Sequence, residues 1–197
     1  MRQTRKWLRF GVAILFLTAI LIYVGALRSY ARDAARQLPQ EHRLLLFHTH
    51  TGERLDIVFR RGDKYVPEAI AKLDYFLRDH RTGEVRHFDP RMYDILEELT
   101  YVVGHPSGQI DIVCGYRTPW SNEFLRARTA GVAKNSLHLR AEAIDLRMPG
   151  VETSQLREAA LSLHDGGVGY YPHSDFIHVD IGRVRQWCFN CGSAGGE

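Results

Sequence analysis

The sequence has few cysteines, little net charge, and no repeated or low-complexity tract. It contains three cysteines and carries a formal net charge of +3. So small a charge gives no reason to expect a nucleic-acid partner. No consecutive arginine pair occurs in the basic N-terminal stretch, so a twin-arginine export signal is not expected. One C-x-x-C pair is present, Cys188 and Cys191, whereas a zinc knuckle needs a second. In an oxidising compartment these two cysteines would pair with each other.

The composition suits one globular domain preceded by a hydrophobic segment. The chain has 197 residues, 45% hydrophobic and 25% charged. Residues 10–27 are uncharged and come after four basic residues. A run of about 18 such residues can cross a bilayer core of about 30 Å, and the preceding basic residues favour export of the chain beyond it. We therefore predict a transmembrane helix within residues 1–27, anchoring the protein in the inner membrane with its domain in the periplasm. The alternative is a cleaved signal peptide and a free periplasmic protein.

The rest of the chain divides into a linker at residues 28–42, a domain at 43–187 and a tail at 188–197. Alternating apolar residues predict strands at 43–47, 55–60, 109–115, 142–148, 168–171 and 176–181. Helical spacing and end signals predict helices at 66–76, 89–103, 120–130 and 153–164. Helices precede antiparallel strands instead of alternating with them, which predicts an α+β fold.

Three residues of the types that zinc accepts lie in the second half of the predicted domain. His138 precedes a predicted strand, Asp145 lies within that strand, and His178 lies in the last strand. Alternation would place Ile177 and Val179 on one face of that strand and His178 on the other. Three protein ligands leave a fourth position for water, which is typical of a catalytic zinc site. Each residue alone is weak evidence, but together they predict a Zn²⁺ site.

The arrangement of these residues resembles that of a known family. Residues 136–145 have the pattern Ser-x-His-x-x-Ala-x-Ala-x-Asp, and Asp-x-x-His comes later, at 175–178. This is similar to the M15-type zinc D,D-peptidases, whose motif is Ser-x-His-x-x-Gly-x-Ala-x-Asp with Glu-x-x-His or His-x-His. The similarity to their DUF882/YcbK-like subgroup of murein endopeptidases extends over about residues 43–187. The segments that carry it are 52–53, 77–84, 114–118, 131–138, 166–172 and 178–180.

The resemblance implies a Hedgehog/D,D-peptidase-like fold, in which a small antiparallel sheet carries the zinc site. It makes His138, Asp145 and His178 the zinc ligands. Arg117 matches the family arginine that faces the substrate carbonyl oxygen, a task for which a permanently charged guanidinium is suited.

The general base has two candidates. Asp175 stands where the family has the glutamate of Glu-x-x-His, and Asp180 shares a strand face with His178. We favour Asp180 slightly because a strand holds it rigidly. Ala141 replaces the motif glycine, and if the glycine served a positive φ, alanine strains the loop by about 1 kcal/mol or more. Tyr170, Tyr171 and His173 are candidates for lining the substrate groove.

These observations predict a zinc metallopeptidase that cuts cross-links between the peptide stems of peptidoglycan. Which cross-link is cut, D-alanine to diaminopimelate or diaminopimelate to diaminopimelate, stays open at this point. A zinc D,D-carboxypeptidase is one alternative. A metal-containing, non-catalytic peptidoglycan-binding module is another, since the changed glycine and the shortened acid could mean lost activity.

Overall fold

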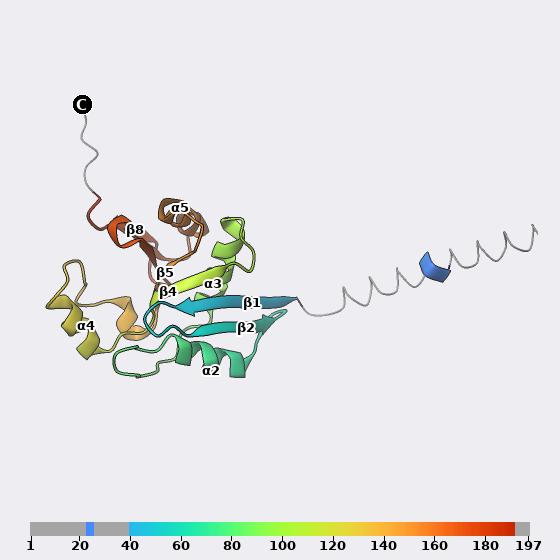
Figure 1. Ribbon diagram of the computed structural model, residues 1–197, viewed down its shortest axis with the longest axis horizontal. Helices are drawn as coiled ribbons and strands as arrows, with labels where there is room; N and C mark the ends of the chain where they lie inside the picture. Colours follow the sequence, from blue (N-terminus) through green and yellow to red (C-terminus); the bar gives the residue numbers. More distant parts are fainter. Residues whose placement is uncertain (1–22, 26–39, 192–197) are drawn as a thin grey trace, which may run out of the picture. The chain divides into compact units, whose positions relative to one another are not determined.

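The computed structural model describes residues 23–25 and 40–191, and from Glu41 onward the chain forms one unit (Figure 1). Among the described residues, no helix combines the length and the apolar character needed to cross a membrane. The longest α-helix of the folded unit, α3, has 12 residues, whereas a membrane span needs about 20. Most of the predicted membrane segment, residues 10–22 and 26–27, lies outside the described residues. This finding corrects the predictions of a transmembrane helix and an inner-membrane location, which the described residues do not support, and it gives no support to the predicted membrane partner. They rested on an uncharged run and the basic residues before it, a pattern that is compatible with a membrane helix but does not establish one.

One eight-stranded sheet forms the centre of the folded unit, in the order β3-β2-β1-β4-β5-β7-β6-β8. Its strands are β1 (Glu41–His48), β2 (Arg54–Arg61), β3 (Lys64–Tyr65), β4 (Gln109–Cys114), β5 (Ala143–Arg147), β6 (Gly167–Tyr171), β7 (Phe176–Asp180) and β8 (Arg185–Cys188). Most neighbouring strands are antiparallel, but β1 pairs with β4, and β6 with β8, in parallel.

The predicted small antiparallel sheet is therefore wrong in size and in strand direction, although the mixed α+β composition is as expected. Alternation in a sequence identifies a strand but not its neighbour. The chain runs from the hairpin of β1 and β2 to β4 through residues 62–108, which contain β3 and two helices.

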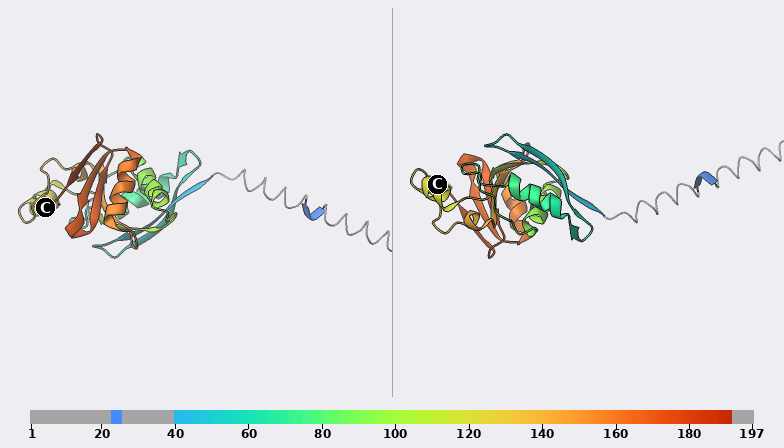
Figure 2. Two further views of the ribbon diagram at one scale, coloured as in Figure 1. Left: turned by 90° about the horizontal axis from the view of Figure 1, so that it is seen from above. Right: turned by 90° about the horizontal axis from the view of Figure 1, so that it is seen from below.

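The helices that bury the sheet's apolar face are α2 (Pro67–Phe76), α3 (Arg91–Val102) and α5 (Thr153–Leu163). Figure 2 shows α3 and α5 side by side against the sheet. Met92, Ile95, Leu96 and Leu99 recur at helical spacing and are all buried, so α3 presents one continuous apolar stripe.

The strands that hold the candidate ligands contribute to the same core from their other face. Ile144 and Leu146 of β5, and Ile177 and Val179 of β7, belong to the buried cluster. Replacing one of the larger aliphatic side chains with alanine would cost about 2–5 kcal/mol. This packing fixes the two strands, and therefore Asp145 and His178 on their opposite face.

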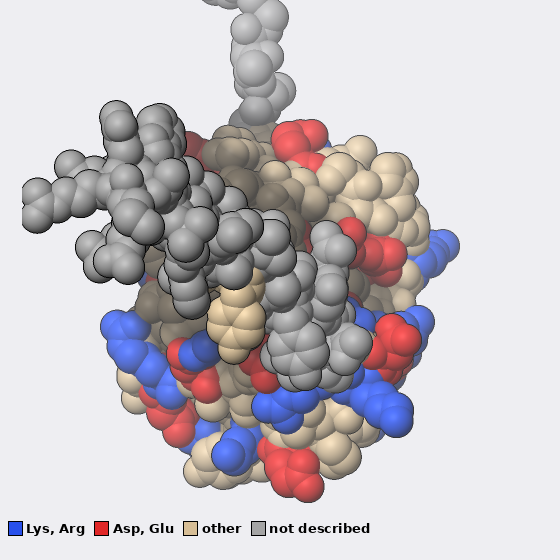
Figure 3. Space-filling model, turned by 90° about the vertical axis from the view of Figure 1, so that its right-hand side faces the viewer, with Lys and Arg blue, Asp and Glu red and all other residues tan. Residues whose placement is uncertain are grey.

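Charges of both signs are mixed on the surface. In Figure 3, basic and acidic side chains lie next to each other on the visible face of the domain. Ion pairs such as Arg61–Glu41, across the β1–β2 hairpin, and Arg91–Asp89 account for part of this mixture.

Candidate metal centre and active site

A row of paired residues crosses three adjacent strands and forms the floor of the site. Cys114 of β4 lies opposite Asp145 of β5, which in turn lies opposite His178 of β7. Residues that pair directly across strands share a face of the sheet, so a thiol, a carboxylate and an imidazole lie in line. The row continues through Gly169 of β6 to Trp187 of β8.

His138 reaches this row from a short 3-10 helix, η1 (Leu137–Arg140). The Ser136 hydroxyl accepts a hydrogen bond from the backbone N–H of His138 at 3.4 Å and caps the turn. Ala141 ends the turn in the left-handed conformation, with φ 57° and ψ 40°. The motif Ser-x-His-x-x-Gly is thus a tight turn with a cap at each end, and Ala141 occupies a position that favours glycine.

The side chains of His138, Asp145 and His178 converge on one point. Nε2 of His138 lies 3.1 Å from Oδ1 of Asp145 and 3.1 Å from Nδ1 of His178. Nδ1 of His178 lies 2.9 Å from the same Asp145 oxygen. All three side chains are at least 90% buried. The structure therefore brings together the three ligands that the sequence predicted.

In each imidazole, the ring nitrogen that points away from the centre donates a hydrogen bond. The other ring nitrogen of a neutral imidazole then carries a lone pair, and it faces the centre. Nδ1 of His138 donates to the carbonyl oxygen of Gly115 at 2.8 Å, because a carbonyl can only accept. Nε2 of His178 donates to Oδ2 of Asp180 at 3.0 Å. The neutral imidazoles therefore point Nε2 of His138 and Nδ1 of His178 at each other and at a carboxylate oxygen. Three acceptors this close repel one another unless a proton or a cation lies between them.

The shifted pKa values show the same need for positive charge. Burial alone would lower the pKa of His138, but the adjacent Asp145 carboxylate and Cys114 outweigh it and raise this pKa to about 10. Burial would raise the pKa of Asp145, yet the nearby His138 and His178 hold it well below its usual range. Without a metal, a proton thus stays in the cluster. A divalent cation would displace that proton on binding.

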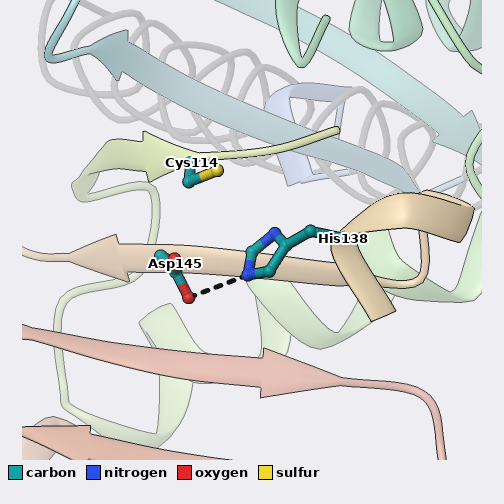
Figure 4. A group of neighbouring side chains, drawn as sticks. All are labelled: Cys114, His138 and Asp145. Atoms are coloured by element: carbon teal, nitrogen blue, oxygen red, sulfur yellow. Dashed lines mark hydrogen bonds and ion pairs between the residues drawn. The ribbon is translucent and has the colours of Figure 1, made fainter. Parts of the chain in front are cut away.

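Cys114 lies close to the centre and is a rival ligand. Its Sγ and the ligand atoms of His138 and Asp145 lie within 4.8 Å of one another (Figure 4). The thiol also accepts a hydrogen bond from Nη2 of Arg117 at 3.3 Å. His178, with contacts of 2.9 and 3.1 Å, lies closer to the other two ligands, so we regard it as the better third ligand. Cys114 was not among the ligands that the sequence predicted.

Asp180 lies behind His178, not in the centre. Its carboxylate accepts the hydrogen bond from Nε2 of His178 and two further bonds from the guanidinium of Arg185, at 3.0 and 2.7 Å. The backbone N–H groups of Gly167 and Gly182 also donate to it. With five bonds on two oxygens and an exposure of 1%, this carboxylate is fully engaged. The geometry favours an orienting role over the predicted role as a base.

Asp175 lies at the other end of β7 and points away from the centre. It accepts a hydrogen bond from the Thr153 hydroxyl, and Oδ2 lies 3.9 Å from Nη1 of Arg147. Its side chain is 68% exposed, and it does not line the cleft beside the centre. Its φ is 51°, in the left-handed region, which aspartate adopts more readily than most residues. This backbone conformation is a structural reason for an aspartate at position 175.

Arg117, the residue predicted to stabilise charge, is buried beside the centre. Nη2 lies 3.7 Å from Oδ2 of Asp145, and Nη1 donates to Oδ1 of Asn122 at 3.2 Å. Asn122 belongs to α4 (Pro119–Arg126), whose N-cap is Thr118. Asp79 accepts hydrogen bonds from the backbone N–H and hydroxyl of Thr118, at 2.8 and 2.7 Å. The loop that carries Arg117 is therefore held on both sides.

The centre opens into a cleft of about 380 Å³. The segment at residues 129–137 lines it except for Lys134, together with Arg117, the three candidate ligands and Ser174. Four aromatic side chains and a cation complete the lining: Tyr171, Phe176, Trp187, Phe189 and Arg185. Sequence reasoning missed the contribution of β8, whose four residues are too short a run for a period-2 signal.

Of the three predicted groove residues, the structure brings only Tyr171 to the cleft. Tyr170 and His173 are not among its lining residues. Tyr170 lies on the other face of β6, where the guanidinium of Arg157 lies 5.6 Å from its ring. His173 lies in the turn η2 (Pro172–Ser174).

Comparison with known proteins assigns the chain to a family. The M15 peptidase family described as peptidoglycan L,D-endopeptidase MepK matches residues 36–187. The chain belongs to this family. The predicted relationship to the M15-type murein endopeptidases is thereby confirmed, and with it the prediction of a peptidase that acts on peptidoglycan.

Individual relatives agree with the family assignment. The probable peptidoglycan L,D-endopeptidase MepK of Haemophilus influenzae is 38% identical over 186 residues, which cover 94% of this chain and 96% of the relative. The peptidoglycan L,D-endopeptidase MepK of Escherichia coli K12 is 40% identical over 154 residues, covering 78% and 84%. M15 peptidases are metallopeptidases, which fits the convergent donor set of the centre.

Proposed function

We propose that this protein is a zinc-dependent peptidoglycan L,D-endopeptidase whose metal ligands are His138, Asp145 and His178. The observation that carries the proposal is the convergence of two imidazole lone pairs and one carboxylate oxygen, at mutual distances of 2.9–3.1 Å. Ligand atoms at zinc bonding distance in tetrahedral geometry lie about 3.3–3.4 Å apart, so a small outward movement of the side chains accommodates the ion.

Two imidazoles and one carboxylate are a donor set that zinc accepts in catalytic sites, with a fourth position left for water or substrate. When bound, zinc polarises a substrate carbonyl and lowers the pKa of a coordinated water towards neutrality. The cleft beside the centre gives a peptide access to that position.

We infer that Asp180 orients His178 and does not act as a base. A carboxylate on the far nitrogen of a ligating histidine fixes its tautomer and its ring orientation. Arg185 holds both Asp180 oxygens and thereby fixes the carboxylate in turn. Arg117 supplies a positive charge next to Asp145, where it would help to stabilise negative charge that develops on the substrate.

The L,D specificity in the family's description supports one of the two cross-links as the substrate. An L,D bond joins the carbonyl of an L centre to the amine of a D centre. The diaminopimelate–diaminopimelate cross-link contains such a bond, whereas D-alanine–diaminopimelate joins two D centres. We therefore propose the diaminopimelate–diaminopimelate cross-link as the substrate.

The test is digestion of muropeptide dimers of defined linkage by the purified full-length protein loaded with zinc, with the products read by mass spectrometry. Conversion of diaminopimelate–diaminopimelate dimers to monomers, abolished by a chelator and by His138→Ala, is the expected result. Release of D-alanine alone would identify a carboxypeptidase instead. Binding of dimers by the zinc-loaded protein without any product would show a non-catalytic module.

A further inference from the structure

Tyr171 presents a hydroxyl to the cleft whose proton has no acceptor among the described residues. Nε1 of Trp187 donates a hydrogen bond to the Tyr171 oxygen at 3.2 Å. An indole nitrogen can only donate, so the phenol oxygen is the acceptor in this bond. Its own O–H is therefore left to donate to another group. Tyr171 lines the cleft together with the three candidate ligands.

The phenol is held in place by aromatic contacts. Its ring stacks on Phe176 with centroids 4.4 Å apart and planes at 14°. The Phe189 ring lies 5.7 Å away. A hydroxyl on a fixed ring needs little reorganisation during a reaction, which is the property of an effective transition-state donor.

Trp187 links the phenol to the metal centre. Its ring lies against Gly169 of β6, 5.1 Å from the ring of His178, and its Nε1 reaches the Tyr171 oxygen. Gly169 makes room for it, since a Cβ at Gly169 would lie 2.5 Å from Cζ2 of the indole. The missing side chain at Gly169 thus lets the indole lie flat across the sheet and reach both neighbours.

Most other strong donors near the centre already have partners; Nε of Arg117 has none within the described part of the chain, but this atom is buried. The Nη atoms of Arg117 bind Asn122 and Cys114, and those of Arg185 bind Asp180. The indole N–H of Trp187 is taken by Tyr171 itself. Burial raises the pKa of Tyr171 above its ordinary value, so the hydroxyl keeps its proton at neutral pH.

We propose that Tyr171 is a catalytic residue whose hydroxyl donates a hydrogen bond to the scissile carbonyl oxygen as negative charge develops there, and that Trp187 positions it. This inference rests on the proposed endopeptidase function. It assigns to the neutral phenol a part of the charge stabilisation that Arg117 alone would otherwise provide.

The test compares Tyr171→Phe with Tyr170→Phe in the full-length, zinc-loaded enzyme. Both variants lose one hydroxyl from neighbouring positions on β6, but only Tyr171 faces the cleft. Tyr171→Phe is expected to lower kcat on the diaminopimelate cross-link by about 100-fold, with little change in KM and full zinc content. Tyr170→Phe is expected to retain the wild-type kcat. A kcat for Tyr171→Phe within about twofold of wild type, or loss of zinc from this variant, would overturn the proposal.

The positioning role of Trp187 is tested by a double-mutant cycle. Trp187→Phe keeps a ring over Gly169 but removes the N–H, and it is expected to lower kcat by about 10-fold. If Trp187 acts through the Tyr171 hydroxyl, the same change made in Tyr171→Phe lowers kcat no further. Equal losses in both backgrounds would refute the positioning role. If the wild-type enzyme cleaves no L,D cross-link, the proposed function fails; if it cleaves one and Tyr171→Phe matches it, only this inference fails.

Discussion

The Asp180 carboxylate accepts a hydrogen bond from Nε2 of His178 at 3.0 Å, and this nitrogen is the one that does not face Asp145. The bond links Asp180 to the candidate metal centre through His178, although Asp180 itself lies behind that residue. Its pKa is lowered although burial opposes this, because His178 and Arg185 both bind its charged form. The carboxylate is therefore ionised whenever the protein is folded near neutral pH.

Asp180→Asn is predicted to weaken zinc binding by about 10- to 100-fold, because the amide holds the imidazole less firmly and makes it less basic. Asp175→Asn serves as the matched control, since Asp175 contacts Thr153 and Arg147 outside the cleft. We expect its zinc affinity and kcat to stay close to those of wild type. Competition titration with a zinc chelator measures the affinities. A kcat of Asp175→Asn reduced by a thousandfold or more would instead identify Asp175 as the base.

Cys114→Ala is predicted to keep one zinc ion per chain, whereas His178→Ala is predicted to lose it. The reason is that His178 contacts both other ligands at hydrogen-bonding distance, while the Cys114 thiol is held by Arg117. Metal analysis after dialysis against a weak chelator gives the stoichiometry. The opposite pattern would make Cys114 the third ligand.

Ala141→Gly is predicted to be tolerated better than Ala143→Gly, by about 1–2 kcal/mol in the free energy of unfolding. Both alanines are buried, so each change removes a similar methyl group from the interior. Only Ala141 has a left-handed conformation, which glycine adopts without strain. Urea denaturation of the two variants measures the difference. Equal losses would show that φ 57° at Ala141 costs nothing.

Stability is predicted to fall between pH 6.5 and pH 4 because of His48. This histidine is fully buried at the end of β1, and its Nε2 has no hydrogen-bond partner among the described residues. Burial, reinforced by the neighbouring His50, lowers its pKa to about 4 and outweighs the opposing charge of Glu53. Below pH 6.5 the His48 side chain is protonated in the unfolded chain but stays neutral in the folded protein until the pH approaches 4. The free energy of unfolding therefore drops by up to about 3 kcal/mol over this range.

His48→Gln removes this titration, so the unfolding free energy of the variant should depend less steeply on pH than that of wild type over this range. His80 has a pKa lowered to about 4 by the same causes, and it remains as a second contribution in both proteins. Denaturation at pH 7, 5.5 and 4.5 compares the slopes. Identical slopes would mean that His48 is protonated in the folded state.

The convergence of His138, Asp145 and His178 could be predicted from the sequence because the motif and strand alternation both act locally. Alternation placed His178 and Asp180 on one face, and the structure has them so. Alternation does not tell whether the Asp180 oxygens are free. They are held by Arg185 from β8, a strand of four residues that carries no periodic signal.

The strand order could not be predicted for a related reason. The parallel pairing of β1 with β4 depends on how α2 and α3 pack against the sheet, which is a property of the whole core. The strand predicted at 43–47 lies within β1, but a local pattern does not identify the strand that pairs with it. For the same reason, the sequence did not identify Trp187, which packs against Gly169, as a residue of the site.

The position of β8 in the chain has a consequence for when the contacts around the site can form. It is the last strand of the described residues, yet it supplies Arg185 to Asp180 and Trp187 to Tyr171. A ribosome releases these residues after every other element of the site. During synthesis the hydrogen bonds from Arg185 to Asp180 and from Trp187 to Tyr171 can therefore form only after this strand has docked.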